Sequence, residues 1–156
     1  MDALNRDIWL FHLAFRQLVR LPDGVLAQRG LSRIHHRLLW VIGRFGEVAV
    51  GDLAERLEIT RQGLHGPMRQ LREAGLITSR PSERNRTIQL VSLTQQGTDL
   101  EQELNALQRR HMELALSDAG EQAQDGWRRV MSALGQVLPA DDASARPPDP
   151  LHTEAA

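Results

Sequence analysis

Side chains that can donate hydrogen bonds to nucleic acid are concentrated in one segment, ITRQGLHGPMRQLREAGLITSRPSERNR, at residues 59–86. Between residues 60 and 88, six arginines stand against two acids, although the whole chain has a net charge of −1. Arginine and glutamine are suited to bidentate contacts with guanine and adenine, and arginine also pairs with phosphate. The candidate DNA contacts in the first half of the segment are Thr60, Arg61, Gln62, Gly63, His65, Gly66, Arg69 and Gln70.

This first half has the pattern of an amphipathic helix. Leu64, Met68 and Leu71 recur at spacings of four and three, which places them on one face, and the polar side chains fall largely on the others. Thr60 is a good N-cap, and Gly75 stands where a helix C-terminus favours a positive φ. Taken alone, such a helix could also present an ordinary solvated face. The two inner glycines would either let DNA approach closely or ease the packing of the helix.

The second half of the segment is predicted to form a β-hairpin. The strand-like stretches LITS and IQLVSL flank a polar loop. Arg80, Arg84 and Arg86 lie in or beside this loop. A narrow minor groove attracts arginine through its enhanced negative potential, so we expect at least one insertion, with Arg86 ahead of Arg84. The alternative is a solvated hairpin loop.

Two predicted helices precede this segment. Ser32 caps the first, which Gly46 ends. The second spans residues 51–57 and is separated from Arg61 by the three residues EIT. Two helices joined by a short turn, the second polar on its outside, form the helix-turn-helix layout. Ser32 and Arg33 are therefore candidate contacts to the DNA backbone.

Amphipathic stretches flank these elements on both sides. Residues 4–21 are apolar on two sides, which is typical of a helix that packs on its own domain and on a partner, and Pro22-Asp23-Gly24 is expected to end it. A seam like that of a coiled coil, and then a second apolar stripe, follow the hairpin. They consist of Leu100, Leu104, Leu107, His111 and Leu114, and of Ala123, Trp127, Val130, Leu134 and Val137. The proline-rich residues 139–156 are expected to be disordered.

Other classes of protein are disfavoured. The 156 residues include no cysteine, and no apolar run approaches the ~20 residues that a membrane span needs. The start MDALNRD lacks the basic region of a signal peptide, so we expect a cytoplasmic protein. There is no phosphate-binding loop, dinucleotide turn or nucleophile motif, so neither catalysis nor a cofactor is expected. His35 and His36 are adjacent and would point about 100° apart on a helix, which argues against a metal site.

The segments VGDLAERL, TRQGLHGPMRQLREAGLI and LTQQG, in this order, resemble the multiple antibiotic resistance regulator (MarR) family of bacterial transcription factors. The resemblance implies a mainly α (α+β) fold and a homodimer, with the helix at about 60–74 in the major groove and a wing arginine in the minor groove. The implied parts are a single family domain (1–138), a winged helix-turn-helix (31–93) and dimerisation helices (4–21 and 98–138).

The chain departs from the family pattern at two places. The wing commonly carries an Asp-Arg-Arg or Asp-Lys-Arg run, and here either Asn85-Arg86 or Glu83-Arg84 takes that place. Pro67 lies within the predicted recognition helix, where it removes one backbone bond, so we expect a kink or irregular turn without loss of the helix.

The resemblance also implies a pocket for a small, often aromatic or anionic effector between the dimerisation helices and the winged domain. Residues that would offer stacking and cationic donors to such a ligand are Trp9, His12, His36, Arg37 and Trp40. The alternative for each of them is ordinary core packing.

We therefore expect a sequence-specific, ligand-responsive repressor that binds a pseudo-palindromic DNA operator as a homodimer. The alternative is a winged-helix module that binds a protein and not DNA. The hairpin loop with Arg84 and Arg86 discriminates between these two hypotheses. If the loop inserts into DNA, replacing these arginines should weaken operator binding.

Overall fold

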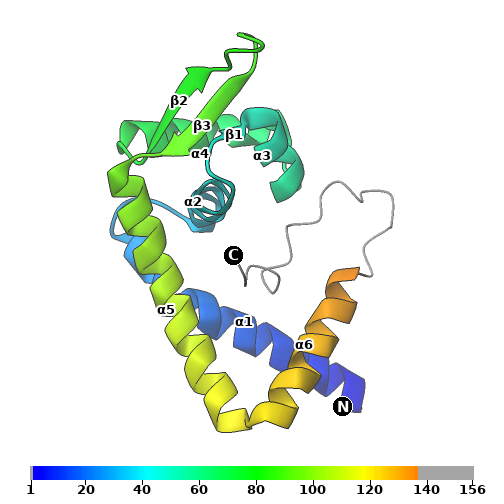
Figure 1. Cartoon of the computed structure of the whole chain (residues 1–156). Coiled ribbons are helices and arrows are strands. Elements are labelled where there is room, and N and C mark those ends of the chain that lie inside the picture. Colours follow the sequence, from blue (N-terminus) through cyan, green and yellow to red (C-terminus); the bar gives the residue numbers. More distant parts are fainter. Residues whose placement is uncertain (1, 137–156) are drawn as a thin grey trace, which may run out of the picture. The chain divides into compact units, whose positions relative to one another are not determined.

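The computed structural model describes residues 2–136 and divides after Leu114 into two compact units, which are described separately. The first unit contains α1 (Ala3–Ala27), α2 (Arg33–Phe45), β1 (Val48–Ala49), α3 (Val50–Leu57), α4 (Arg61–Glu73), β2 (Ile77–Pro81), β3 (Gln89–Leu93) and most of α5 (Gln95–Ala119) (Figure 1). The second contains the end of α5 and α6 (Glu121–Gln136). The predicted fold class, mainly α with a winged helix-turn-helix, is confirmed.

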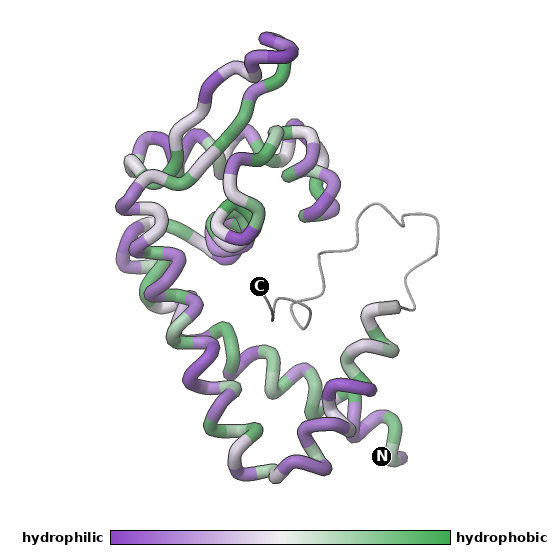
Figure 2. The backbone as a smooth tube through the Cα atoms, in the orientation of Figure 1, coloured by the Kyte–Doolittle hydropathy of each residue, from purple (hydrophilic) through white to green (hydrophobic). Residues whose placement is uncertain are grey.

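Helix α2 lies at the centre of the first unit. Leu38 and Leu39 are fully buried, and the helix packs against α1, α3, α4 and β3. Figure 2 shows hydrophobic residues gathered around α2. The predicted apolar face of α4, Leu64, Met68 and Leu71, is buried in the same core. Because this face is buried, the polar residues of α4 remain at the surface.

The ends of α4 are capped as predicted. The Gly63 N–H donates to Thr60 Oγ1 at 3.1 Å, which satisfies one orphan donor of the first turn. Gly75 has a φ of +69°, and beyond it the Leu76 N–H donates to the Leu71 carbonyl at 2.9 Å. Pro67 lies inside α4 without ending it, so the predicted survival of the helix is confirmed.

The three strands form one antiparallel sheet in the order β1-β3-β2. Val48 of β1 pairs with Val91 of β3, and Ile77 of β2 pairs with Leu93 of β3. The β2-β3 hairpin projects beyond the helices (Figure 1). The predicted hairpin is therefore confirmed, and the sheet anchors its base in the core while its loop stays free.

The residues LTQQG fix the start of α5 against the end of α4. The Thr94 hydroxyl accepts from the Gly97 N–H at 3.1 Å and donates to the Gly75 carbonyl at 2.7 Å. A Cβ on Gly97 would lie 1.9 Å from the Leu76 carbonyl oxygen. Glycine at this position is thus required by the close approach of α5 to the chain between α4 and β2.

The prediction that Pro22-Asp23-Gly24 ends the first helix is wrong, because α1 continues to Ala27 with Pro22 inside it. Proline removes one helical hydrogen bond, but Pro22 and Leu26 are both fully buried, and this burial offsets the loss. Gln28 is the C-cap of the helix, and the chain then turns at Gly30, which has a φ of +67°.

The predicted seam on α5 is divided between two environments. Leu100 and Leu104 are 4% and 0% exposed because they belong to the core of the first unit, whereas Leu114 is 61% exposed. The prediction of one continuous seam for a partner chain is therefore wrong for its first two members. On α6, Trp127, Val130 and Leu134 are exposed, and Val137 and the predicted disordered tail lie outside the described residues.

Gly97→Ala is expected to lower the stability of the protein by about 1–3 kcal/mol, because the new methyl group would overlap the Leu76 backbone. Thermal unfolding followed by circular dichroism would measure the loss. Gly126→Ala is the matched control: no atom lies within 4 Å of its Cβ position, and alanine is the better helix former. Equal melting temperatures for the two variants would contradict the close approach.

Candidate nucleic-acid interface

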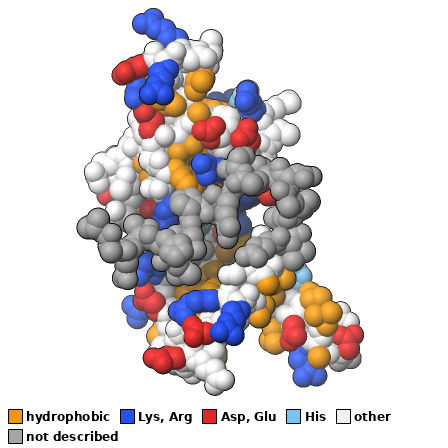
Figure 3. Space-filling model, turned by 45° about the vertical axis from the view of Figure 1, so that its right-hand side comes forward, with side chains coloured by type: hydrophobic (Ala, Val, Ile, Leu, Met, Phe, Trp, Pro, Cys, Tyr) orange, Lys and Arg blue, Asp and Glu red, His pale blue; other side chains and the backbone are white. Residues whose placement is uncertain are grey.

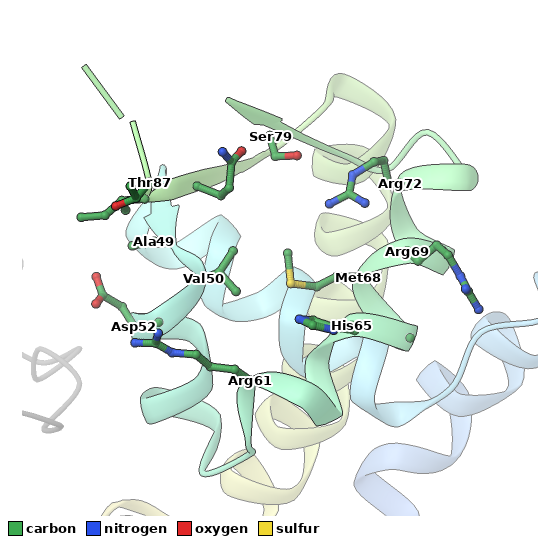
Figure 4. A pocket seen from close by; sticks show the side chains of 14 residues that line it. Ala49, Val50, Asp52, Arg61, His65, Met68, Arg69, Arg72, Ser79 and Thr87 are labelled. Atoms are coloured by element: carbon green, nitrogen blue, oxygen red, sulfur yellow. The ribbon is translucent and has the colours of Figure 1, made fainter. Parts of the chain in front are cut away.

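A surface groove of about 880 Å³ lies between α4, the start of α3 and the hairpin (Figure 4). His65, Met68 and Arg72 face the groove from α4, and Ser79 and Thr87 line it from the hairpin (Figure 4). Four of the predicted DNA contacts line it together, namely Arg61, His65, Gly66 and Arg69. Arg61, Arg69 and Arg72 stand against one acid, Asp52, among the lining residues, so the groove can accept an anionic backbone. The Arg69 guanidinium extends away from the cavity (Figure 4) and lies 3.9 Å from Glu73.

Arg61 lies at the α3 end of this groove. Its Nη2 atom is 3.0 Å from the position that a Cβ would take on Gly51, so the missing side chain of Gly51 leaves room for the guanidinium. Figure 4 shows Arg61 extending toward Asp52. Arg72 was not selected from the sequence. Its spacing of seven from His65 places both on one helix face and could have identified it.

The two inner glycines of α4 have different roles. A Cβ on Gly63 would lie 2.9 Å from Ile59 Cγ2, so this glycine permits the close packing of the helix start on the preceding turn. No atom lies within 4 Å of the Cβ position of Gly66, which lines the groove. Gln62 is exposed beside them and does not line the groove. Gly66 is therefore the one of the two that leaves space for a ligand.

Arg80 is held at the base of the wing by Glu47. Its Nε donates to Glu47 Oε1 at 2.8 Å and its Nη2 to Oε2 at 2.7 Å, and Glu83 is 3.7 Å from Nη1. The hydrogen bond to Glu47 raises the pKa of Arg80 above its ordinary value. The guanidinium is thus already paired, and a DNA contact by Arg80 stays a prediction.

A tight turn presents Arg86 at the end of the hairpin. The Ile88 N–H donates to the Asn85 carbonyl at 2.9 Å, and Asn85 Oδ1 accepts from the Thr87 N–H at 3.0 Å. Arg84 and Arg86 are exposed and form no ion pair with any residue from 2 to 136. Figure 3 shows arginine side chains gathered at this end of the molecule. Which of the pairs Asn85-Arg86 and Glu83-Arg84 takes the place of the family's wing pair stays a prediction.

The start of α2 is joined to α4 by a buried histidine. The Ser32 N–H donates to His35 Nδ1 at 2.9 Å, and His35 Nε2 lies 2.8 Å from Gln70 Oε1. His35 is 3% exposed. Ser32 is confirmed as the N-cap of α2, and the connection through His35 was missed. A capping partner three residues after a serine is the signal that could have revealed it.

Arg33 and Asp23 form an ion pair, and the guanidinium stands 5.3 Å above the ring of Phe15. The hydrogen bond to Asp23 raises the pKa of Arg33. Arg33 therefore faces α1, and its predicted contact with the DNA backbone remains untested.

A second concavity, of about 410 Å³, lies beside α2. His36, Arg37 and Trp40 line it, as predicted for an effector pocket, whereas Trp9 and His12 are exposed on α1 and do not line it. The other lining residues are Phe15, Val19, Arg33, Val41, Arg56, Leu57 and Gln108. Aromatic rings and basic groups are thus combined in one cavity.

The polar groups of this cavity are only partly paired. Arg37 Nη2 donates to the Leu57 carbonyl at 2.9 Å, while His36 Nε2 and Arg56 Nε are buried without a partner among the described residues. The Arg56 guanidinium lies 4.0 Å from the centre of the Phe45 ring. Burial lowers the pKa of His36, so its ring is neutral near pH 7. An anionic or hydroxylated ligand would supply the missing partners.

Acidification is expected to destabilise the protein through His36. Because burial lowers its pKa in the folded state, the unfolded chain binds the proton first, and stability falls as the pH drops below about 6.5 toward the folded pKa. His36→Gln should reduce this loss, measured by urea unfolding between pH 7.5 and 5. His12→Gln, at an exposed site, is the control. Equal acid sensitivity of both variants would contradict the assignment.

Within residues 2–136, no helix is long and apolar enough to cross a membrane. The same part of the chain contains no group of three histidine, aspartate or glutamate side chains that could hold a metal ion.

Comparison with known proteins agrees with this geometry. The helix-turn-helix regulator PetP of Rhodobacter capsulatus is 35% identical over 133 residues, which cover 85% of this chain and 80% of PetP. FabT of Streptococcus pneumoniae, solved in complex with DNA, has a TM-score of 0.76 at 18% identity, covering 88% of this chain and 97% of its own. NadR, solved with 4-hydroxyphenylacetate, has a TM-score of 0.67 at 20% identity, covering 88% of this chain and 95% of its own.

A model of the MarR family matches residues 29–86. The chain therefore belongs to the MarR family of DNA-binding transcription regulators and is not an enzyme.

Proposed function

We propose that this protein is a homodimeric, ligand-responsive repressor that binds a pseudo-palindromic operator. The observation that carries the proposal is the groove between α4 and the hairpin, together with Arg84 and Arg86 at the wing tip, which form no ion pair within residues 2–136. Helix α4 would enter the major groove, and Arg86 or Arg84 would reach the adjacent minor groove. Sequencing the genomic DNA that the protein retains would test this, since a dimer predicts two half-sites about one helical turn apart, ~34–36 Å.

Exposed apolar side chains on the terminal helices support the homodimer. On the first half of α1, Leu4 is 70% exposed and Ile8 50% exposed. Trp127 and Leu134 of α6 are 43% and 56% exposed. Apolar surface of this extent is typical of an interface, and we propose that a second copy of this chain covers it.

The cavity beside α2, which His36, Arg37 and Trp40 line, supports the proposed response to a ligand. A small aromatic anion would stack on its rings and accept hydrogen bonds from its basic groups. NadR, which shares the fold, was solved in complex with such an anion, 4-hydroxyphenylacetate. Ligand binding would weaken operator binding if the ligand prefers a conformation with a different spacing of the two α4 helices. Repression, and action in the cytoplasm, belong to the same proposal.

Replacing both Arg84 and Arg86 by Ala is expected to weaken operator binding tenfold or more, because the minor-groove and phosphate contacts of the wing are lost. The dependence of log K on log salt should also become shallower, measured by fluorescence anisotropy.

Arg109→Ala is the control for this double variant, because Arg109 is an exposed arginine that lies on α5, outside the wing, and pairs with Glu113. Unchanged DNA affinity of the wing variant, together with loss of a protein partner, would favour the alternative of a protein-binding winged helix.

Binding of 4-hydroxyphenylacetate is expected to strengthen as the pH falls from 7.5 to 5.5. The free His36 is largely neutral because burial lowers its pKa, and a bound carboxylate would favour its protonated form, so the complex holds more protons. Isothermal titration calorimetry at several pH values would measure the trend. His36→Gln should flatten it and His12→Gln should not. The same pH dependence in both variants would argue against a ligand beside His36.

A further inference from the structure

Both ring nitrogens of His35 are used inside the protein. Nδ1 lies 2.9 Å from the Ser32 backbone nitrogen, whose N–H can only donate, and 3.1 Å from Ser32 Oγ, whose hydroxyl can donate to Nδ1 as well. Nε2 lies 2.8 Å from Gln70 Oε1 on α4. With 3% of its surface exposed, His35 has no room for water to replace either bond. The ring therefore joins the first turn of α2 to the second half of α4.

The Ser32 contact decides which tautomer His35 adopts. Because Nδ1 accepts from the Ser32 N–H, it carries no proton, and the single proton of the neutral ring is on Nε2. Nε2 must then donate, and its partner on Gln70 must be the amide oxygen. The backbone of α2 thereby fixes the orientation of an amide on α4 through one intervening ring.

We propose that His35 orients the Gln70 amide so that it contacts DNA as a hydrogen-bond donor. The Gln70 oxygen is held by His35, and the amide NH2 group remains for the operator, since Gln70 is exposed on α4. A free glutamine reads adenine bidentately by accepting from N6 and donating to N7. Because the Gln70 oxygen is directed at His35, the side chain presents its NH2 group to a base. It should therefore prefer guanine, whose O6 and N7 both accept, thymine O4 or a phosphate oxygen over adenine, where only N7 accepts and the 6-amino group is itself a donor.

Gln62 provides an internal contrast. It is exposed on the same helix, and its side chain forms no hydrogen bond with any described residue. Its amide can rotate to suit either an acceptor or a donor. The two glutamines of α4 are therefore expected to differ in base preference although their chemistry is identical.

The inference depends on the proposed DNA binding by α4, and the experiment separates the two. The protein is first used to select its operator from random DNA, and each position is then tested with wild type, Gln70→Ala and Gln62→Ala. Gln70→Ala should weaken the selected operator about threefold to tenfold, and the affected position should be guanine or thymine. Replacement of the affected guanine by 7-deazaguanine, or of thymine by an analogue without O4, should weaken wild type but not Gln70→Ala.

A phosphate contact gives a different result in the same assay. In that case Gln70→Ala keeps the base preferences of wild type at every position. Replacing the contacted phosphate by a methylphosphonate should then abolish the difference in operator affinity between this variant and wild type. An adenine whose 6-amino group is required by wild type but not by Gln70→Ala would overturn the proposal. So would equal affinity of Gln70→Ala and wild type for every operator. If wild type retains no DNA, the proposed function itself fails.

The tautomer is tested without DNA. In the folded protein, long-range ¹H–¹⁵N correlation spectra should show the His35 proton on Nε2, and a proton on Nδ1 would overturn the inference. His35→Leu should release the amide and reduce the discrimination against adenine at the affected position, with thermal unfolding as the check that the variant is folded. Discrimination equal to that of wild type in a folded His35→Leu variant would also overturn it.

Discussion

The burial of α2 is the interaction on which the other parts of the first unit depend. Leu38 and Leu39 of this helix each gain roughly 1.5–3 kcal/mol from leaving water. The helix as a whole packs against α3, α4 and β3. The same packing sets the position of α4, whose Leu64 and Leu71 are fully buried. The proposed recognition by α4 therefore depends on a core that, among the groove-lining residues of α4, includes only Met68.

Hydrogen bonds then hold the start of α5 and the base of the wing in the positions that the core sets. Thr94 joins the start of α5 to the end of α4 by accepting from Gly97 and donating to Gly75. Glu47 holds Arg80 at the base of the wing, which leaves Arg84 and Arg86 as the wing's unpaired cations among the described residues. The hydrogen bonds thus divide the arginines into those that stabilise the fold and those that remain for an anionic partner.

Adjacent histidines of α2 face different surroundings because successive helix positions point about 100° apart. His35 contacts Gln70 on α4, whereas His36 lines the cavity beside α2, where its Nε2 has no partner among the described residues. One rigid helix thereby touches both the proposed ligand cavity and the proposed reading surface. If a ligand shifted α2, the hydrogen bond from His35 would move the Gln70 side chain with it. This contact would couple ligand binding to DNA binding over a short distance.

Local pattern alone determined the helix-turn-helix, its caps at Thr60 and Gly75, and the hairpin, because helical and strand periodicity and capping are set by near neighbours in sequence. Predictions from local pattern were wrong where contacts between residues far apart in sequence decide the structure. Pro22 stays helical because it is buried, and Leu100 and Leu104 face their own core and not a partner. Sequence could not show that Arg33 and Arg80 are paired or that Gln70 is held by His35, because each partner lies 10 to 35 residues away. The residue types fixed which chemistry was possible, and only the tertiary structure decided which side chains remain available for it.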